Sequence, residues 1–193
     1  MSDADLVARA LEGDASAFGE LVDRHRSAVF RAALAALGSH ADADDAAQDA
    51  CVIAFERLHT FRGDASFKTW LLTIVWHQAI NRRRSLARWF RRTIASRQRR
   101  EDADQPWMNL ASTDDSPEQH MATVQLRRAI AEEIRRLTPR LRDALLLAQS
   151  GEHSYEEIGA MVGSPVGTIK WRVSEARRVI KARLIRRGFV DVG

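Results

Sequence analysis

Hydrophobic positions along this chain recur every three and four residues, which is the spacing of amphipathic helices. The segment 15–37 shows the pattern clearly, with Phe18, Leu21, Val22, His25 and Val29 on one face. We find no convincing strand alternation and no internal repeat. The pattern therefore predicts an all-α fold.

The same spacing, interrupted at Gly38-Ser39-His40 and around Gly63, divides the chain into helices. The predicted helices span residues 3–12, 15–37, 42–58, 66–84 or a little beyond, 117–137, 138–148, 154–161 and 165–187. Asp42, Asp44 and Asp45 fall in the first turn of the third helix, where they favour the positive end of its dipole.

Three helix starts near the C-terminus are marked by capping residues. Thr138-Pro139 and Ser164-Pro165 each predict a hydroxyl N-cap followed by proline in the first helical position. Ser154 with Glu157 has the spacing of a capping box. Together they predict a short helix, a tight turn and a longer final helix.

The predicted organisation is two small helical domains joined by a flexible linker. We expect the first domain over residues 1–85, the linker over 86–120 and the second domain over 121–193. Pro106, Pro117 and many small polar residues favour a partly extended linker. The aromatic residues Trp89, Phe90 and Trp107 are candidate anchors onto a partner.

Composition limits the possibilities further. The chain has 193 residues, of which 45% are hydrophobic and 29% charged, so it can bury a core. No apolar run approaches the ~18–20 residues of a membrane span, and the N-terminus has no signal-peptide pattern. A single cysteine and scattered histidines predict neither a disulfide nor a metal site. We expect a cytoplasmic protein without metal or cofactor.

The net charge of +4 hides an alternation of sign along the chain. Residues 1–81 carry −5, residues 82–100 carry nine arginines without an acid, residues 101–120 carry −6, and residues 121–193 carry +6. Blocks of opposite sign suggest separate surfaces for separate partners.

The last two predicted helices form a helix-turn-helix pattern, in which Ile158, Val162 and Ile169 would fill the shared core. In the final helix, Ile169, Val173, Ala176, Ile180 and Leu184 make an apolar stripe. The opposite side would present Lys170, Trp171, Ser174, Glu175 and Arg178 to DNA. A solvated basic helix is the plain alternative, but caps, turn and charge together favour DNA binding.

A second candidate surface lies on the fourth predicted helix and the loop before it. The helix aligns Trp70, Thr73, His77, Asn81 and Arg84 on one face. The loop region holds Phe61, Arg62, Asp64, Ser66, Phe67 and Lys68. Rings, amides and arginines in this pattern suit unpaired bases and their phosphates. Periodicity alone favours a core position for Trp70 and leaves Trp76 undecided.

The third helix has an acidic, polar face made by Asp45, Gln48, Asp49 and Glu56. This face would repel DNA and suits a basic protein partner, unless it is simply solvated. Cys51 lies in an apolar stretch and is expected to be a buried small hydrophobic residue.

These motifs, in this order, resemble the extracytoplasmic-function (ECF) sigma factors of the sigma-70 family, over residues 3–85 and 118–187. The first conserved region resembles residues 42–49, and the promoter-melting segment resembles residues 61–71 followed by His77 and Asn81. The reader of the minus-thirty-five element resembles Leu137-Thr138-Pro139-Arg140, residues 155–159 and residues 165–170.

The resemblance implies a transcription initiation factor rather than an enzyme. Core RNA polymerase and promoter DNA would be the partners, with Asp45, Gln48 and Asp49 docking on the beta-prime clamp helices and the second domain on the beta flap. Minus-ten DNA would meet Phe61, Arg62, Asp64, Ser66, Phe67, Lys68, Trp70, His77, Asn81 and Arg84. Minus-thirty-five DNA would meet Thr168, Lys170, Trp171, Ser174, Glu175 and Arg178. A cognate anti-sigma factor is a further expected partner.

The chain departs from the family pattern at Ala46-Ala47, His77, Trp171 and Glu175. These departures bear on the promoter sequence, since Glu175 could accept from a cytosine and Lys170 could contact a guanine. Two other classes remain open on the residues alone. One is a stand-alone helix-turn-helix regulator, and the other is an RNA- or membrane-surface-binding protein acting through Arg82–Arg100.

Overall fold

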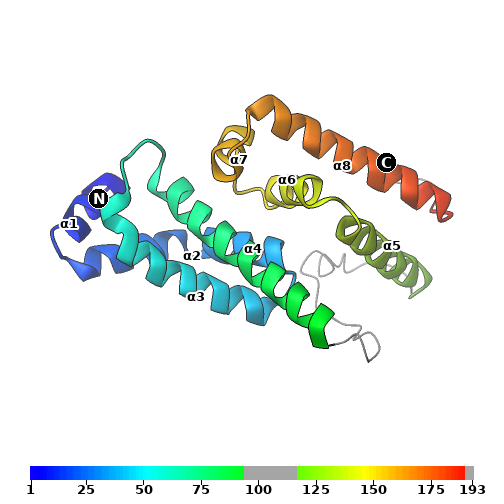
Figure 1. Ribbon diagram of the computed structural model, residues 1–193, viewed down its shortest axis with the longest axis horizontal. Helices are drawn as coiled ribbons and strands as arrows, with labels where there is room; N and C mark the ends of the chain where they lie inside the picture. The colour runs from blue at the N-terminus through cyan, green and yellow to red at the C-terminus, as the bar shows by residue number, and fades with distance from the viewer. Residues whose placement is uncertain (94–116, 190–193) are drawn as a thin grey trace.

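The computed structural model describes residues 1–93 and 117–189, and every regular element in these two ranges is a helix. The first bundle consists of α1 (Asp3–Leu11), α2 (Ala15–Leu37), α3 (His40–Arg57), the short η1 (Leu58–Thr60) and α4 (Phe67–Thr93). The second consists of α5 (Pro117–Arg135), α6 (Pro139–Gln149), α7 (Tyr155–Val162) and α8 (Val166–Arg186). Figure 1 shows the two bundles side by side. The prediction of two helical domains is confirmed.

Helix starts in the first bundle follow from short polar side chains. The Ser2 hydroxyl accepts from the Asp5 backbone, and the Asp5 carboxylate accepts from the Ser2 backbone, which makes a capping box on α1. The Asp14 and Ser39 side chains cap α2 and α3 by accepting from backbone N–H groups in the first turn, without a reciprocal bond. Gly38 ends α2 in the left-handed conformation, with φ of 74°, so the chain can turn directly into α3.

The first bundle packs around α4. Helical spacing places Leu71, Ile74, Val75 and Ala79 on one face of α4. All but the half-buried Ile74 are fully buried, and Trp76 joins them. The face of α3 turned toward α2 and α4 is made of Ala43, Ala46, Ala50 and Ala54. Since these side chains are small, the α3 backbone can approach its neighbours closely. Ala46, a departure from the family pattern, belongs to this contact.

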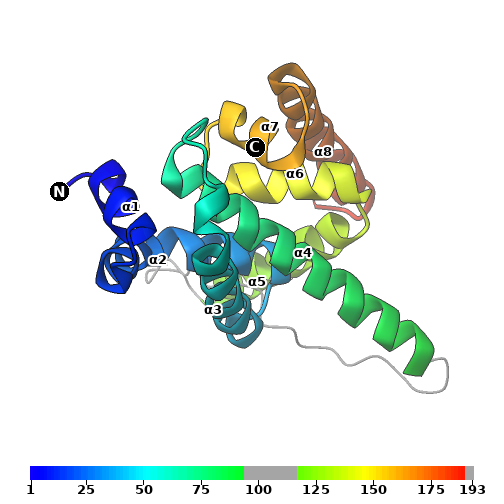
Figure 2. The same cartoon turned by 60° about the vertical axis from the view of Figure 1, so that its left-hand side comes forward.

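α4 is longer than predicted. It continues to Thr93 and extends beyond the bundle, which is clearest in Figure 2. Residues 82–93 contain neither glycine nor proline, and arginine is a good helix former, so nothing in the sequence ends the helix earlier. The first part of the segment expected to be a partly extended linker is therefore helical. Trp107 and the side chains of Trp89 and Phe90 lie outside the described residues.

In the second bundle the predicted stripe of α8, from Ile169 to Leu184, is buried against its neighbours. Ser154 and Glu157 form the predicted capping box on α7. Thr138 is the N-cap of α6 and Pro139 its first residue, as predicted, although the Thr138 hydroxyl makes no capping bond. The predicted cap at Ser164 is wrong. Ser164 instead accepts a bond from Arg172 at 3.1 Å, and Pro165 is the N-cap of α8.

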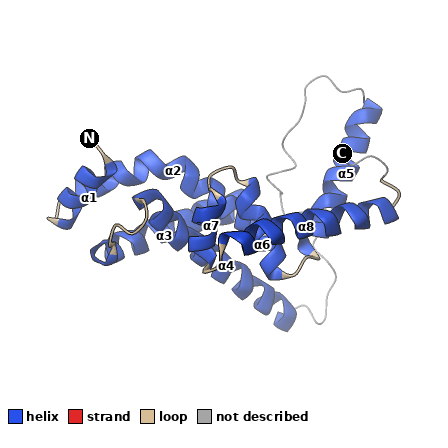
Figure 3. Ribbon diagram, turned by 90° about the horizontal axis from the view of Figure 1, so that it is seen from above, coloured by secondary structure: helices blue, strands red, loops and turns tan. Residues whose placement is uncertain are grey.

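The two bundles contact each other through α2 with α6 and α4 with α7. The view from above in Figure 3 also shows α6 and α7 over the first bundle. Buried residues from both bundles form one continuous cluster. No helix within the described ranges is long and apolar enough to cross a membrane.

Candidate nucleic-acid and partner interfaces

The predicted docking residues Asp45, Gln48 and Asp49 are all exposed on the outer side of α3. Arg82 of α4 reaches across to this face, with its guanidinium 2.8 Å from Asp45 and 3.8 Å from Asp49. Helical spacing could not predict this contact, because Asp45 and Arg82 lie 37 residues apart in the chain. Arg82 therefore offsets part of the acidic charge that the sequence predicted.

Two exposed apolar side chains, which the sequence analysis did not identify, extend the predicted docking face. Val52 is 55% exposed and Phe55 is 50% exposed, one and two turns along α3 from Asp49. The ring of Phe55 also touches Phe18 edge-on, with centroids 5.0 Å apart. An acidic face that continues into exposed apolar side chains is typical of a protein-binding surface. The signal in the sequence is the same i, i+3, i+4 spacing from Asp45.

Cys51 is half-buried between the docking face and the core, and burial raises the pKa of its thiol. A raised pKa keeps the thiol protonated and poorly nucleophilic. The unreactive thiol agrees with the expected small hydrophobic residue, although Cys51 is half-buried rather than buried.

The loop before α4 is built on an aromatic cluster. Phe67 is only 3% exposed and lies 6.0 Å from Phe61 and 5.7 Å from Trp70, centroid to centroid. The ring of Phe67 is therefore not exposed for the predicted contact with DNA. It instead supports the two half-exposed rings beside it. Trp70 is half-buried, intermediate between the core and DNA-facing positions considered from its spacing.

The remaining predicted minus-ten residues form an open stripe. His77, Asn81 and Arg84 are exposed along α4, and Arg62 and Asp64 are exposed in the loop. Ser66 lies at the start of α4, where its hydroxyl accepts from the Thr69 backbone at 3.1 Å. Lys68 is the exception, because its ammonium binds Glu152 of the second bundle at 3.4 Å.

In the helix-turn-helix, Gly159 of α7 allows the turn to fold back. A Cβ at this position would lie 2.7 Å from the backbone oxygen of Ser164, closer than side-chain carbons approach. Of the predicted core residues, Ile158 and Ile169 are fully buried and Val162 is half-buried. Gly163 takes the left-handed conformation between the helices, with φ of 61°. These contacts fix α8 relative to α7.

The predicted reading face of α8 is open to solvent. Trp171 is 62% exposed, and Lys170, Ser174 and Arg178 are exposed on the same side. Thr168 is half-buried near the start of the helix. Glu175 accepts two bonds from Arg178, each of 2.7 Å, and this pairing lowers the pKa of its carboxyl.

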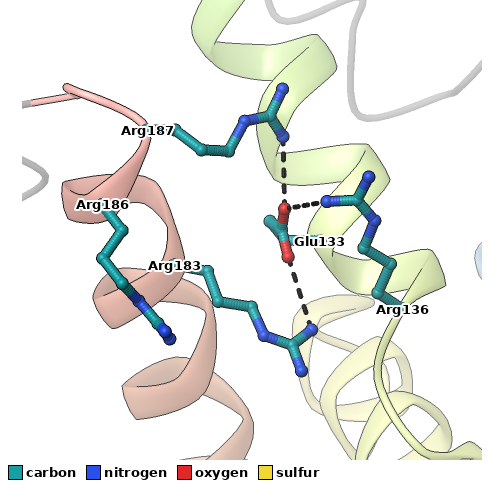
Figure 4. A pocket seen from close by; sticks show the side chains of 5 residues that line it. All are labelled: Glu133, Arg136, Arg183, Arg186 and Arg187. Atoms are coloured by element: carbon teal, nitrogen blue, oxygen red, sulfur yellow. Dashed lines mark hydrogen bonds and ion pairs between the residues drawn. The ribbon is translucent and has the colours of Figure 1, made fainter.

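A charged cluster that the sequence did not predict joins α5 to α8. Glu133 is 1% exposed, and Figure 4 shows arginines around its carboxylate. The distances are 2.8 Å to Arg136, 3.4 Å to Arg183 and 3.2 Å to Arg187. Burial alone would raise the pKa of Glu133, but the surrounding guanidinium groups lower it overall. These residues and Arg186 line an open pocket of about 340 Å³.

Among the described residues no group of three or more histidine, cysteine or acidic side chains could hold a metal ion. Three candidate surfaces are exposed: an acidic and apolar one on α3, an aromatic and basic one on the loop and α4, and a basic one on α8.

Comparison with known families gives one match within each bundle. Residues 21–90 match the family described as Sigma-70 region 2, and residues 127–180 match Sigma-70 region 4. The first match contains the surfaces of α3 and α4, and the second contains the helix-turn-helix.

Similar proteins extend over nearly the whole chain. The ECF RNA polymerase sigma-E factor of Escherichia coli K12 is 35% identical and covers 97% of this chain and 98% of its own. The RNA polymerase sigma-H factor of Pseudomonas aeruginosa is 33% identical, covering 94% and 93%.

Two solved structures of similar proteins have the same fold. CnrH, in complex with the cytosolic domain of CnrY, is 26% identical, with a TM-score of 0.63 over 95% of this chain and 97% of that chain. The sigma factor RpoE of Bartonella quintana, solved with the anti-sigma factor NepR, shares the fold with a TM-score of 0.62 at 23% identity, over 86% of this chain and 96% of that chain. The chain therefore belongs to the ECF sigma factors of the sigma-70 family, which direct RNA polymerase to promoters to initiate transcription.

Proposed function

We propose that the three surfaces divide the work of initiation: α3 holds the polymerase, α4 and its loop open the minus-ten element, and α8 reads the minus-thirty-five element. The observation that carries this division is the exposure of a separate face on each helix, one acidic and two basic. In this proposal the polymerase carries out the chemistry, and the chain contributes binding only.

At the minus-ten element, Phe61 and Trp70 stack on unpaired bases while Phe67 holds them in place from below. Stacking contributes about 1–3 kcal/mol per base, enough to favour an open strand. His77 and Asn81 contact base edges or the sugar-phosphate backbone further along α4. Arg62, Lys68 and Arg84 approach phosphates, and Asp64 and Ser66 shape the loop that receives a flipped base.

At the minus-thirty-five element, the first turns of α8 enter the major groove of intact duplex. Lys170 and Ser174 reach base edges, and Trp171 packs against sugars or thymine methyl groups. Arg178 binds a phosphate, or releases Glu175 to accept from a base. Thr168 contacts the backbone at the start of the helix.

For polymerase binding, Asp45, Gln48 and Asp49 contact the beta-prime clamp helices, and Val52 and Phe55 add apolar area beside them. The second bundle contacts the beta flap. Apolar side chains within a charged rim are the usual arrangement of a protein interface.

We further propose that a cognate anti-sigma factor controls this chain in the cytoplasm. The support is the likeness to CnrH, whose solved complex contains the cytosolic domain of CnrY. A partner that covers α3 or α4 would prevent access to polymerase or to DNA.

The decisive experiment is run-off transcription with purified core polymerase on a promoter library. We expect transcripts only when both chain and polymerase are present, and selection of two short elements upstream of the start sites. Sequence-specific duplex binding without polymerase, together with no effect on transcription by core enzyme, would instead identify a stand-alone regulator.

A further inference from the structure

The arginines around Glu133 use only part of their hydrogen-bonding capacity. Arg136, Arg183 and Arg187 each bond to carboxylates through the Nη1 atom alone. Within the described ranges, the Nε and Nη2 atoms of these three side chains have no hydrogen-bond partner. The side chains are 63%, 35% and 36% exposed, so the free donors are accessible. Because a guanidinium group carries five N–H donors, most of the donors at this site are unused.

Arg186 adds a fourth guanidinium group beside them. Its Nε donates to the backbone oxygen of Ala182 at 3.3 Å, and in the part of the chain that the structure describes it pairs with no carboxylate. Two acids belong to the site: Glu133 within it and, at its edge, Glu132, which lies 2.9 Å from Arg187. Four guanidinium groups and two carboxylates leave a local net charge of +2.

Glu133 holds these groups together. Guanidinium groups repel one another, and the buried carboxylate between them offsets that repulsion. Figure 4 shows Arg136 on α5 and Arg183 and Arg187 on α8, on different sides of the carboxylate. Donors that are held in place before a ligand arrives lose less conformational freedom when it binds. The free donors are therefore arranged in advance for an anion.

The space beside the free donors has the size of a small-ligand site. The pocket has a volume of about 340 Å³, near the lower end of the ~300–1,000 Å³ that ligand sites occupy. Phosphate oxygens accept from a guanidinium edge in a bidentate geometry, which makes arginine well suited to binding phosphate. Because several guanidinium groups line one pocket, an anion with more than one phosphate group can use more of the free donors than a single phosphate can.

The place of the pocket on α8 argues against DNA on the reading face as the source of that phosphate. A helix turns about 100° per residue, so residues nine apart lie about 180° from each other around it. Arg183 is nine residues after Ser174, and Arg187 is nine residues after Arg178. The pocket is therefore on the side of α8 opposite the predicted reading face, where α5 packs.

We propose that this pocket binds a small anion with two or more linked phosphate groups, through the free guanidinium edges of Arg136, Arg183, Arg186 and Arg187. Inorganic polyphosphate and nucleoside di- and triphosphates share this chemistry, and the experiment below distinguishes them. The site is separate from the three surfaces of the proposed function. Since the donors come from α5 and α8, the bound anion joins the two helices and stabilises the second bundle.

The test measures binding of phosphate, pyrophosphate, tripolyphosphate and ATP to the whole chain by isothermal titration calorimetry, at low salt and without Mg²⁺. We expect tripolyphosphate to bind at least about ten-fold more tightly than phosphate, because it reaches more than one guanidinium group. Equal affinities for tripolyphosphate and ATP assign the site to the polyphosphate chain. Tighter binding of ATP assigns it to a nucleotide.

Arg186→Gln tests the pocket directly, and Arg177→Gln is the matched control. Arg186 does not hold Glu133, so its replacement leaves the ion pairs of the site in place. We expect Arg186→Gln to weaken tripolyphosphate binding about five- to ten-fold. Arg177 is exposed on the same helix and does not line the pocket, so its replacement should change the affinity less than about two-fold.

Thermal unfolding gives an independent measurement on the same proteins. Without ligand, both variants should melt like the wild type. Tripolyphosphate should raise the Tm of the wild type and of Arg177→Gln by similar amounts, and that of Arg186→Gln by less, because a ligand stabilises the folded chain according to its affinity.

Three results would overturn the proposal. Absence of binding by all four anions at low salt removes the site. An equal loss of affinity in Arg186→Gln and Arg177→Gln shows attraction by overall charge rather than by the pocket. Displacement of tripolyphosphate by an unrelated duplex or by polyglutamate, at a lower concentration of charge, assigns the arginines to a nucleic-acid backbone or to an acidic protein segment instead.

Discussion

The carboxylate of Glu133 is buried, yet it remains ionised because guanidinium groups from α5 and α8 surround it. Two charge-assisted contacts, to Arg183 and Arg187, join α5 to the C-terminal end of α8, and a third is local, to Arg136 three residues further along the chain. The arginines themselves remain partly exposed, so their own desolvation is small. At the scale of single residues, Glu133 therefore links α5 to the end of α8 through buried ion pairs.

We therefore expect Glu133→Gln to lower the free energy of unfolding by about 1–3 kcal/mol in urea titrations at neutral pH. Glu132→Gln is the control, since Glu132 is more exposed, and its loss should stay below about 1 kcal/mol. Because the folded-state pKa of Glu133 is lowered, its contribution is present above the ordinary value of 4.5 and is lost as the pH falls through the folded pKa. Equal effects of the two variants would contradict this role.

His153 precedes α7 and adds a second pH dependence, which comes from a buried base held neutral rather than from an acid held ionised. Both of its ring nitrogens are buried without a hydrogen-bond partner. Burial lowers its pKa, with Lys68 adding to the effect and Glu157 and Glu152 opposing it. The folded chain therefore holds the neutral imidazole more strongly than the unfolded chain does.

We expect the free energy of unfolding to fall as the pH drops below 6.5, the ordinary pKa of histidine, because the unfolded chain then binds the proton more readily. His153→Gln should weaken this dependence between about pH 7 and about pH 5.5, where most carboxylates stay ionised. His59→Gln, at an exposed position, should leave it unchanged. Chemical denaturation at several pH values compares the three proteins.

At the scale of elements, the helix-turn-helix depends on how closely α7 approaches the turn before α8. Gly159 leaves room for the backbone oxygen of Ser164, which a Cβ would meet at 2.7 Å. Because the obstacle is backbone, rotation of a side chain cannot relieve the contact.

We expect Gly159→Ala to destabilise the protein by about 1–3 kcal/mol and to lower the affinity for minus-thirty-five duplex. Gly167→Ala is the matched control, because a Cβ there would meet nothing within 4 Å. Alanine favours a helix over glycine, so the control should be neutral or stabilised by up to about 1 kcal/mol. Thermal unfolding distinguishes the two; similar destabilisation of both would count against the packing argument.

At the scale of the whole molecule, the fold leaves exposed the face of α3 that is proposed to bind polymerase. Asp49→Arg should weaken binding of core polymerase by at least about ten-fold, because it reverses charge at the centre of that face. Asp23→Arg, at an exposed position on α2, is the control with the same charge change. Both variants should melt like the wild type. Unchanged capture of core polymerase by Asp49→Arg would contradict the docking role.

Much of the fold could be predicted from the sequence because local physics marks it. The capping box at Ser154 and the apolar stripe of α8 depend on neighbours within a few residues, and both are confirmed. The end of α4 was placed too early because composition, not a breaking residue, suggested a linker. The N-cap position of Thr138 is confirmed, although its hydroxyl makes no capping bond, whereas the expected cap at Ser164 is wrong because Pro165 takes the N-cap position of α8.

The candidate site was only partly predictable. Helical spacing aligned His77, Asn81 and Arg84 on one exposed face, as the structure has them. Spacing could not show that Phe67 is buried beneath Phe61 and Trp70, because that depends on rings contributed by α2 and by the loop itself.

The sequence by itself determined the helices, their apolar faces and the motifs of an ECF sigma factor, because these follow from interactions between residues close in the chain. Only the tertiary structure decided which charges meet: Arg82 with the acidic face of α3, Glu133 with its arginines, and Lys68 with Glu152. Such pairs join positions tens of residues apart, and no local pattern encodes them. Their geometry exists only after the apolar faces have packed.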